Sequence, residues 1–319
     1  MTSLAATIAT ELNVQPHQVE AALKLLAEGN TVPFISRYRK EATGGLDDAQ
    51  LRHIEERHTY LVELEERKQT VIEAIEEQGK LTDELKRQIL DAETKARVED
   101  LYLPYKKRRK TKADIAREAG LEELEQLLID APTTNPETTA EKFICEGFPD
   151  TKAVLDGARA ILIDRFATDA DLVGAVRDRV YVEGTMRSSV VEGKEQEGAK
   201  FADYFEFAED LTKLPSHRIL ALFRGEAEGV LSLNVDPGEE AVYEGMIAER
   251  FDLPVQESEW LAKAVRWGWR TKLQISANVD ARMRLKEKAD EGALEAVSYT
   301  HLTLPTILRS CRSRWSPYH

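Results

Sequence analysis

The stretch that decides the fold is DDAQLRHIEERHTYLVELEERKQTVIEAIEEQ, residues 47–78. Its apolar residues recur at three- and four-residue spacing, which places them on one face of a helix: Leu51, Ile54, Leu61, Leu64, Val71, Ile72 and Ile75. Asp47 or Asp48 can cap the first turn, and Gly79 can end the helix. About 30 residues at 1.5 Å each give a length of about 45 Å. So long an amphipathic helix is typical of one that bridges subdomains or contacts several neighbours.

Two shorter helices are predicted upstream of residue 47. Leu4, Ile8 and Leu12 are spaced four residues apart and share one helical face. Pro16 can be the first residue of the next helix, and Gly29 can follow its end. The pair favours a helix-turn-helix-like unit, although a plain helical hairpin fits the same pattern.

Downstream of the long helix the pattern is again mainly helical. APTTNP at 131–136 is a linker, and VLSLNV at 230–235 is the only strand predicted, because it alternates apolar and polar residues. We therefore predict a mainly α, multi-helical fold with a short β element at 230–235. Its domains are expected at 1–131 and 137–296.

The composition changes at about residue 297. The last residues, VSYTHLTLPTILRSCRSRWSPYH, contain three Arg and no Asp or Glu, and they show no helical period. A disordered native tail is one explanation. We favour a foreign end on a truncated chain, because SYTHLTLPTIL is typical of translated adaptor sequence, and we exclude 297–319 from the fold prediction.

Length and composition narrow the class of protein. A chain of 319 residues with 42% hydrophobic residues is expected to form two or more domains. No apolar run is long enough to span a membrane, and the N-terminus lacks the features of a signal peptide. Cys145 and Cys311 are too few for a disulfide framework or a four-ligand zinc site, which favours the cytoplasm. The net charge of −14 repels phosphate, so contact with nucleic acid requires a local basic patch.

Such a patch occurs at KKRRKTK, residues 106–112. Pro104 opposes a continuous helix before it, so we expect an exposed turn. The turn has six basic side chains: Lys106, Lys107, Arg108, Arg109, Lys110 and Lys112. Phosphate contact is the natural use of such a cluster. A nuclear localisation signal and a solvated loop without a partner are the alternatives.

A second basic segment contains Arg37, Arg39 and Lys40. Arg37 and Lys40 are three residues apart and can share a helix face. Phosphate binding and pairing with Glu41 or Asp48 fit this segment equally well.

Aromatic residues accompany two groups of arginines. Phe34 and Tyr38 offer ring faces that can stack on bases or pack inward, and for Phe34 we favour core packing. Trp267 and Trp269 stand among Arg266 and Arg270, and for both tryptophans we favour burial between helices.

Catalytic and metal-binding motifs are weak in this sequence. His53 and His58 are five residues apart and face different sides of a helix, and Cys145 is expected to be a buried, inert thiol. No phosphate-binding, dinucleotide-binding, zinc-protease or serine-hydrolase motif occurs. We therefore expect no enzyme, no cofactor and no metal.

Five blocks of the sequence closely resemble the bacterial Tex family of transcription accessory proteins, and they occur in that family's order. The blocks are GNTVPFISRYRKEATGGLDD at 29–48, EDLYLPYKKRRKTKADIAREAGL at 99–121, AKFADYFEF at 199–207, LPSHRILALFRGEAEGVLSL at 214–233 and RMRLKEKADEGA at 282–293. The resemblance covers about residues 1–296.

The resemblance implies a cytoplasmic, non-enzymatic, nucleic-acid-binding protein of transcription. It also implies that a ribonuclease-H-like domain, helix-hairpin-helix modules and a C-terminal OB-fold RNA-binding domain follow in the family, so this chain would be the N-terminal helical part. Tex proteins are similar in architecture to a eukaryotic elongation factor that travels with RNA polymerase.

Two functional hypotheses remain. In the first, a monomer binds the RNA or DNA backbone through the basic turn at 106–112, with Arg37, Arg39 and Lys40 as further contacts. In the second, the chain is a helical scaffold that docks on RNA polymerase, on the elongation machinery or on its own missing domains.

Overall fold

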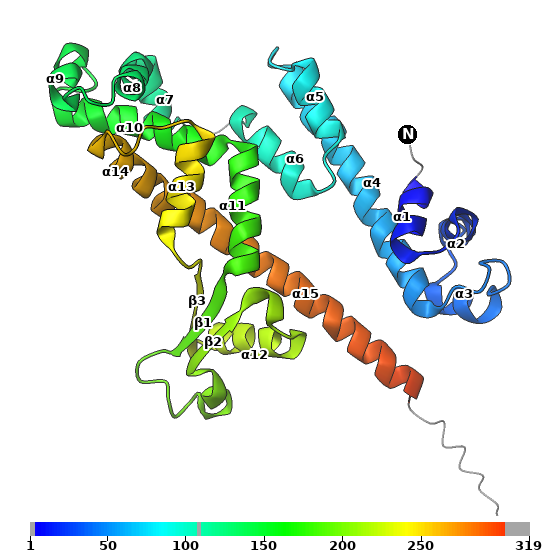
Figure 1. The fold of residues 1–319 in the computed structure, drawn as a ribbon. Coiled ribbons are helices and arrows are strands. Elements are labelled where there is room, and N and C mark those ends of the chain that lie inside the picture. Colours follow the sequence, from blue (N-terminus) through cyan, green and yellow to red (C-terminus); the bar gives the residue numbers. More distant parts are fainter. Residues whose placement is uncertain (1–3, 107–109, 304–319) are drawn as a thin grey trace, which may run out of the picture. The chain divides into compact units, whose positions relative to one another are not determined.

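The computed structural model describes residues 4–106 and 110–303, and its fold is mainly α, as predicted, and contains one small sheet (Figure 1). The chain divides into two compact units. The larger unit contains the described residues up to 185 together with 235–281, and the smaller unit contains 186–234 and 282–303. The domain limits at 131 and 137 stay predictions.

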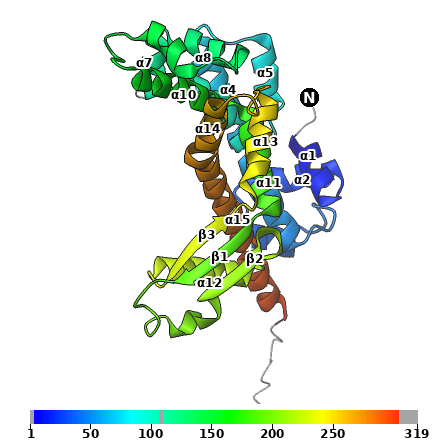
Figure 2. The same cartoon turned by 60° about the vertical axis from the view of Figure 1, so that its left-hand side comes forward.

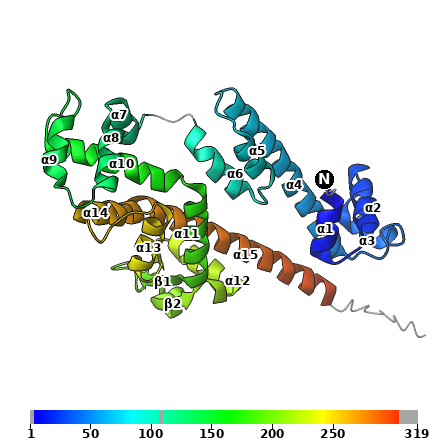
Figure 3. The same ribbon diagram turned by 45° about the horizontal axis from the view of Figure 1, so that its top comes forward.

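The larger unit begins with a group of helices around one long helix, and Figures 1 and 3 show α1, α2 and α3 gathered at one end of it. These elements are α1 (Leu4–Leu12), α2 (Pro16–Ala27), α3 (Val32–Tyr38), α4 (Asp48–Glu76), α5 (Asp83–Leu90), α6 (Lys95–Tyr102) and the 3-10 turn η1 (Leu103–Tyr105). The helix-turn-helix-like character of the first helices stays a prediction.

The long helix α4 confirms the prediction made from its apolar period. Its apolar face is buried from Leu51 to Ile75. The Asp47 carboxylate accepts a hydrogen bond from the Gln50 backbone at 2.8 Å, and the Gln50 side chain accepts one from the Asp47 backbone at 3.0 Å. This reciprocal cap satisfies two donors at the helix start. The 29 residues correspond to a length of about 43 Å.

The rest of the larger unit is a second group of helices. They are α7 (Lys112–Glu118), α8 (Leu121–Asp130), α9 (Pro136–Ala140), η2 (Glu141–Phe143), α10 (Thr151–Thr168), α11 (Ala170–Glu183), α13 (Glu240–Arg250), α14 (Glu259–Gly268), the π-helical turn η5 (Trp269–Leu273) and the start of α15 (Gln274–Thr303). The core of this group contains Tyr243 and Trp269, whose rings stack at a centroid distance of 4.2 Å.

The smaller unit is built on a three-stranded antiparallel sheet in the order β2-β1-β3. Its elements are β1 (Thr185–Val190), η3 (Ala199–Tyr204), β2 (Glu206–Asp210), η4 (Leu211–Lys213), α12 (Ser216–Ala227) and β3 (Leu231–Asp236). The helix α12 lies against the sheet (Figure 2), and its Gly225 leaves room for the buried Leu231 side chain of β3.

Two of these strands were missed by the sequence prediction, which expected only β3. In β1 the inward positions are Met186 and Ser188, and a buried serine breaks the apolar alternation that signals a strand. The structure satisfies that serine, because its hydroxyl donates to the Tyr204 carbonyl at 2.7 Å. The strand β2, EFAED, is short and acidic and has no strong β-propensity pattern.

The C-terminal helix continues beyond the expected boundary. The helix α15 ends at Thr303 and so includes residues 297–303, in which the sequence shows no helical period. The foreign origin of 297–319 stays a prediction. The remaining residues, 304–319, lie outside the described part. No helix among the described residues is long and apolar enough to cross a membrane.

Candidate nucleic-acid interface

The segment after α3 is a tightly held loop. Val32 and Ile35 bury one side of α3, and Thr43 and Leu46 are buried at the other end of the segment. The Thr43 hydroxyl donates to the Lys40 carbonyl at 3.2 Å. The buried residues thus anchor the loop at both ends and leave the side chains between them facing outward.

Two glycines and one glutamine close the loop. The Gln18 amide donates to the Gly44 carbonyl at 2.8 Å and to the Thr43 carbonyl at 3.4 Å. Gly44 and Gly45 have φ of +65° and +94°, a region that favours glycine. A Cβ at Gly44 would lie 2.7 Å from the Gln18 amide nitrogen. The loop therefore has one geometry, fixed by α2.

Three cations project from this loop. Arg37 lies in the last turn of α3, Arg39 is the C-cap residue, and Lys40 follows it; all three are exposed. Lys40 lies beyond the end of α3, so the prediction that it shares a helix face with Arg37 is wrong. The helix ends at Tyr38 and the chain turns toward the buried Thr43.

The side chains of Arg37, Arg39 and Lys40 have no ion pair or hydrogen bond with any other described residue. The alternative of pairing with Glu41 or Asp48 is not found, since Asp48 pairs with Arg52 at 2.8 Å. Among the arginines of residues 4–106 and 110–303, only Arg37, Arg39 and Arg87 lack such a partner. In an acidic chain these guanidinium groups are available to an external anion.

The same loop surrounds a hollow of about 690 Å³. It is lined by Arg37, Tyr38, Arg39, Lys40, Glu41, Ala42, Gly44 and Gly45. Three of these side chains are cationic and one is anionic, so the hollow favours an anionic ligand.

Phe34 and Tyr38 lie outside the core. They are 40% and 71% exposed, and their ring centroids are 5.3 Å apart. The prediction that Phe34 packs into the core is wrong, because Val32 and Ile35 occupy the buried side of this short helix. The two rings, one helical turn apart, contact each other instead.

The tryptophans at 267 and 269 differ from each other. Burial is confirmed for Trp269 and is wrong for Trp267, which is 58% exposed. Their neighbouring arginines are already neutralised, since Arg266 pairs with Glu244 at 3.3 Å and Arg270 with Glu240 at 2.6 Å. This surface offers an external phosphate little unpaired charge.

The basic turn lies between η1 and α7. Lys106 and Lys112 are exposed and form no ion pair within the described part of the chain, whereas Lys110 pairs with Glu118 at 2.6 Å. Three of its cations, Lys107, Arg108 and Arg109, lie outside the described residues. Thr111 caps α7 and exchanges hydrogen bonds with Asp114. Lys112 is the first residue of that helix.

The structure does not bring the two basic segments together. One joins the N-terminal end of α4 through Leu46 and Asp47. The other is tied to the opposite end, where the Gln78 amide donates to the Tyr105 carbonyl at 3.0 Å, next to Lys106. The length of α4, about 43 Å, therefore separates two distinct basic sites.

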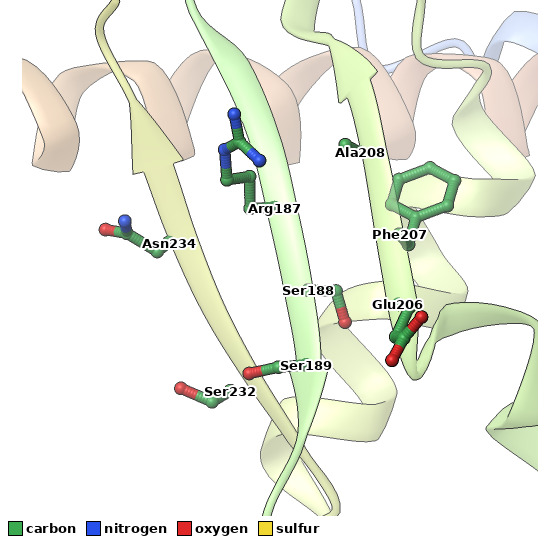
Figure 4. Close-up of a pocket in the computed structure, with 8 residues that line it drawn as sticks. All are labelled: Arg187, Ser188, Ser189, Glu206, Phe207, Ala208, Ser232 and Asn234. Carbon is green, nitrogen blue, oxygen red and sulfur yellow. The ribbon is translucent and has the colours of Figure 1, made fainter.

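The smaller unit has a shallow hollow of about 460 Å³ on its sheet (Figure 4). Six of the eight residues that line it are polar or charged, and the lining consists of Arg187, Ser188, Ser189, Glu206, Phe207, Ala208, Ser232 and Asn234. Sequence reasoning missed this surface because two of its strands were not predicted.

Cys145 is a free thiol that is only half-buried, so the prediction of a buried thiol is wrong. Within residues 4–106 and 110–303, no group of three or more His, Cys, Asp or Glu side chains is placed to hold a metal ion.

The sequence matches two models of one family. The Tex-like protein N-terminal domain matches residues 2–76, and the Tex central region-like model matches residues 131–297. The chain belongs to the Tex family. This confirms the resemblance noted from the five sequence blocks.

Relatives from several organisms agree with this membership. The chain is 49% identical over 294 residues to the transcriptional accessory protein Tex of Neisseria gonorrhoeae, covering 90% of this chain and 39% of that protein. It is 48% identical over 299 residues to protein YhgF of Escherichia coli K12, with 90% and 39% covered. A human S1 RNA-binding domain-containing protein 1 is 29% identical over 231 residues, with 70% and 23% covered. The chain thus spans about two fifths of the length of the Tex relatives it matches.

Proposed function

We propose that this chain is the nucleic-acid-contacting N-terminal part of a transcription accessory protein and that it binds the phosphate backbone. The observation that carries the proposal is the set of unpaired, exposed cations on the fixed loop after α3: Arg37, Arg39 and Lys40. The basic turn from Lys106 to Lys112 adds a second contact site. Membership in a family whose relative is named a transcriptional accessory protein supports this role.

The proposed activity is binding without catalysis in the cytoplasm, by a monomer. Lysine and arginine that contact phosphates position the nucleic acid and do not read its sequence. Polymerase or elongation machinery is the proposed protein partner, in keeping with the family name.

A scaffold role is the second candidate, and one observation favours it. Ile275 and Val279 are 57% and 55% exposed and lie four residues apart on α15. Exposed apolar side chains one helical turn apart are of the kind that packs against a protein surface.

The test is fluorescence anisotropy of the full chain with labelled RNA and DNA at several salt concentrations. Two triple variants neutralise the sites: Arg37, Arg39 and Lys40 to Gln, and Lys106, Lys110 and Lys112 to Gln. The matched control neutralises three exposed cations that already have carboxylate partners, Lys263, Arg266 and Arg270. We expect salt-dependent binding that weakens in each test variant and persists in the control. No binding by the wild-type chain at low salt would leave the scaffold role.

A further inference from the structure

We propose that Phe34 and Tyr38, together with Arg37, Arg39 and Lys40, form a stacking site for single-stranded nucleic acid. This inference rests on the proposed function and specifies its ligand. Stacking of bases on aromatic rings beside a cationic groove is the general mode of single-strand binding.

The aromatic pair has the exposure that stacking requires. Tyr38 is the most exposed large hydrophobic residue in the described part of the chain, and Phe34 supports its ring from one turn earlier at 5.3 Å. The Tyr38 hydroxyl has no hydrogen bond with another described residue. A ring that is 71% exposed, as that of Tyr38 is, is available to an external planar group.

The charges around the pair identify that planar group as part of a polyanion. Arg37 lies between the two rings in sequence, and Arg39 and Lys40 follow directly. Trp267 provides the internal comparison, because it is an exposed aromatic whose flanking arginines are held by Glu240 and Glu244. At α3, exposed aromatic rings and unpaired arginines therefore occur together. At Trp267 the ring is exposed, but the neighbouring arginines are paired.

The loop also presents these groups with little ordering cost. Its backbone is fixed by the Gln18 hydrogen bonds to Thr43 and Gly44 and by the buried side chains of Thr43 and Leu46. Binding thus has to order only the side chains of the site, which favours affinity.

A single strand fits these rings better than a duplex does. Within a duplex the faces of each base are covered by its neighbours, whereas unpaired bases expose a face to an aromatic ring. The cations contact phosphate in either form, so the aromatic pair is the part of the site that discriminates.

The experiment compares the full chain with its Tyr38→Leu, Phe34→Leu and Tyr38→Trp variants. The probes are a labelled single strand of about eight nucleotides, as RNA and as DNA, and a duplex of the same sequence. Trp267→Leu is the matched control, since it removes an exposed aromatic of similar exposure. Thermal unfolding checks that each variant folds. A fluorescent adenine analogue in the strand reports stacking through quenching.

We expect Tyr38→Leu to weaken single-strand binding about tenfold, to abolish the quenching and to leave duplex binding and the salt slope unchanged. Phe34→Leu should act in the same direction, Tyr38→Trp should retain binding, and Trp267→Leu should have no effect. Salt-dependent binding that Tyr38→Leu does not alter would overturn the stacking site and leave the proposed function standing. Absence of any nucleic-acid binding by the wild-type chain would overturn both, and capture of an acidic peptide by the same residues in that case would identify a protein-binding surface.

Discussion

Arg177 of α11 forms an ion pair with Asp100 of α6, in which one guanidinium nitrogen, Nη1, contacts both carboxylate oxygens. Its guanidinium donates to the two carboxylate oxygens at 2.9 and 2.8 Å, and it also donates to the Ser276 hydroxyl at 2.9 Å. The Asp100 side chain is buried and that of Arg177 nearly so. Burial raises the pKa of Asp100, and the neighbouring Arg177 opposes that rise. The contact joins helices that are far apart in sequence.

Removing one member of this pair should destabilise the larger unit. Asp100→Ala leaves a guanidinium with little solvent and should lower the free energy of unfolding by about 2–3 kcal/mol. The double variant Asp100→Leu, Arg177→Met should recover most of the loss, because two apolar side chains of similar size need no charge partner. Urea unfolding of the single and double variants measures both effects. If the single and the double variant lose the same free energy of unfolding, the unpaired charge is not the cause of the destabilisation.

The contact between Asp171 of α11 and Arg97 of α6 should make the stability of the larger unit depend on pH. Hydrogen bonding to Arg97 at 2.5 Å, helped by Arg250 at 3.0 Å, lowers the pKa of Asp171 below its ordinary value of 3.8. A lowered folded-state pKa gives stability that is present above 3.8 and is lost as the pH falls through the folded-state value. Because Asp171 is half exposed, the contribution should be at most about 1 kcal/mol.

The comparison of wild type with Asp171→Asn tests this dependence. Thermal unfolding between pH 7 and pH 3 should show a constant advantage of the wild type down to about pH 4.5 and a shrinking advantage below it. If the extra stability of the wild type grows as the pH falls, the pKa of Asp171 is not lowered by folding.

Gly44→Ala should open the loop that carries the basic site. Both Gly44 and Gly79 have φ of +65°, but only at Gly44 would a Cβ meet a neighbour, the Gln18 amide at 2.7 Å. Gly79→Ala therefore measures the backbone strain alone. We expect Gly44→Ala to cost about 1 kcal/mol more, since Gln18 must move and release its carbonyl acceptors. Chemical denaturation of the two variants gives the difference, and equal costs would refute the role of Gln18.

The two basic sites should bind short oligonucleotides independently. They are separated by the length of α4, about 43 Å. A strand of about six nucleotides is therefore too short to occupy both sites at once. Titration calorimetry should give two equivalents for the wild type and one for each triple Gln variant. With longer strands the losses in binding free energy of the two variants should add, because the sites share no partner. A single equivalent for the wild type would contradict two separate sites.

The helices are the part of the fold that could be predicted with the greatest detail. The apolar period of α4 and its Asp47 cap are local features, and each is found in the structure. The β1 strand could not be predicted in this way, because Ser188 becomes an inward-facing residue only when Tyr204 supplies an acceptor from another segment. The β2 strand is short and acidic, so its sequence carries no strong strand pattern.

The sequence by itself determined the helical class, the Tex family and the two basic segments, since periodicity, caps and charge are local properties of the chain. Only the tertiary structure decided which of these side chains face solvent without a partner. Phe34 and Trp269 both occur near arginines in the sequence. Phe34 is exposed and Trp269 is buried, because neighbouring helices cover Trp269 only. Likewise Arg270 has a carboxylate partner from α13 and Arg37 has none among the described residues. Burial and pairing depend on segments distant in sequence, and packing alone brings those segments together.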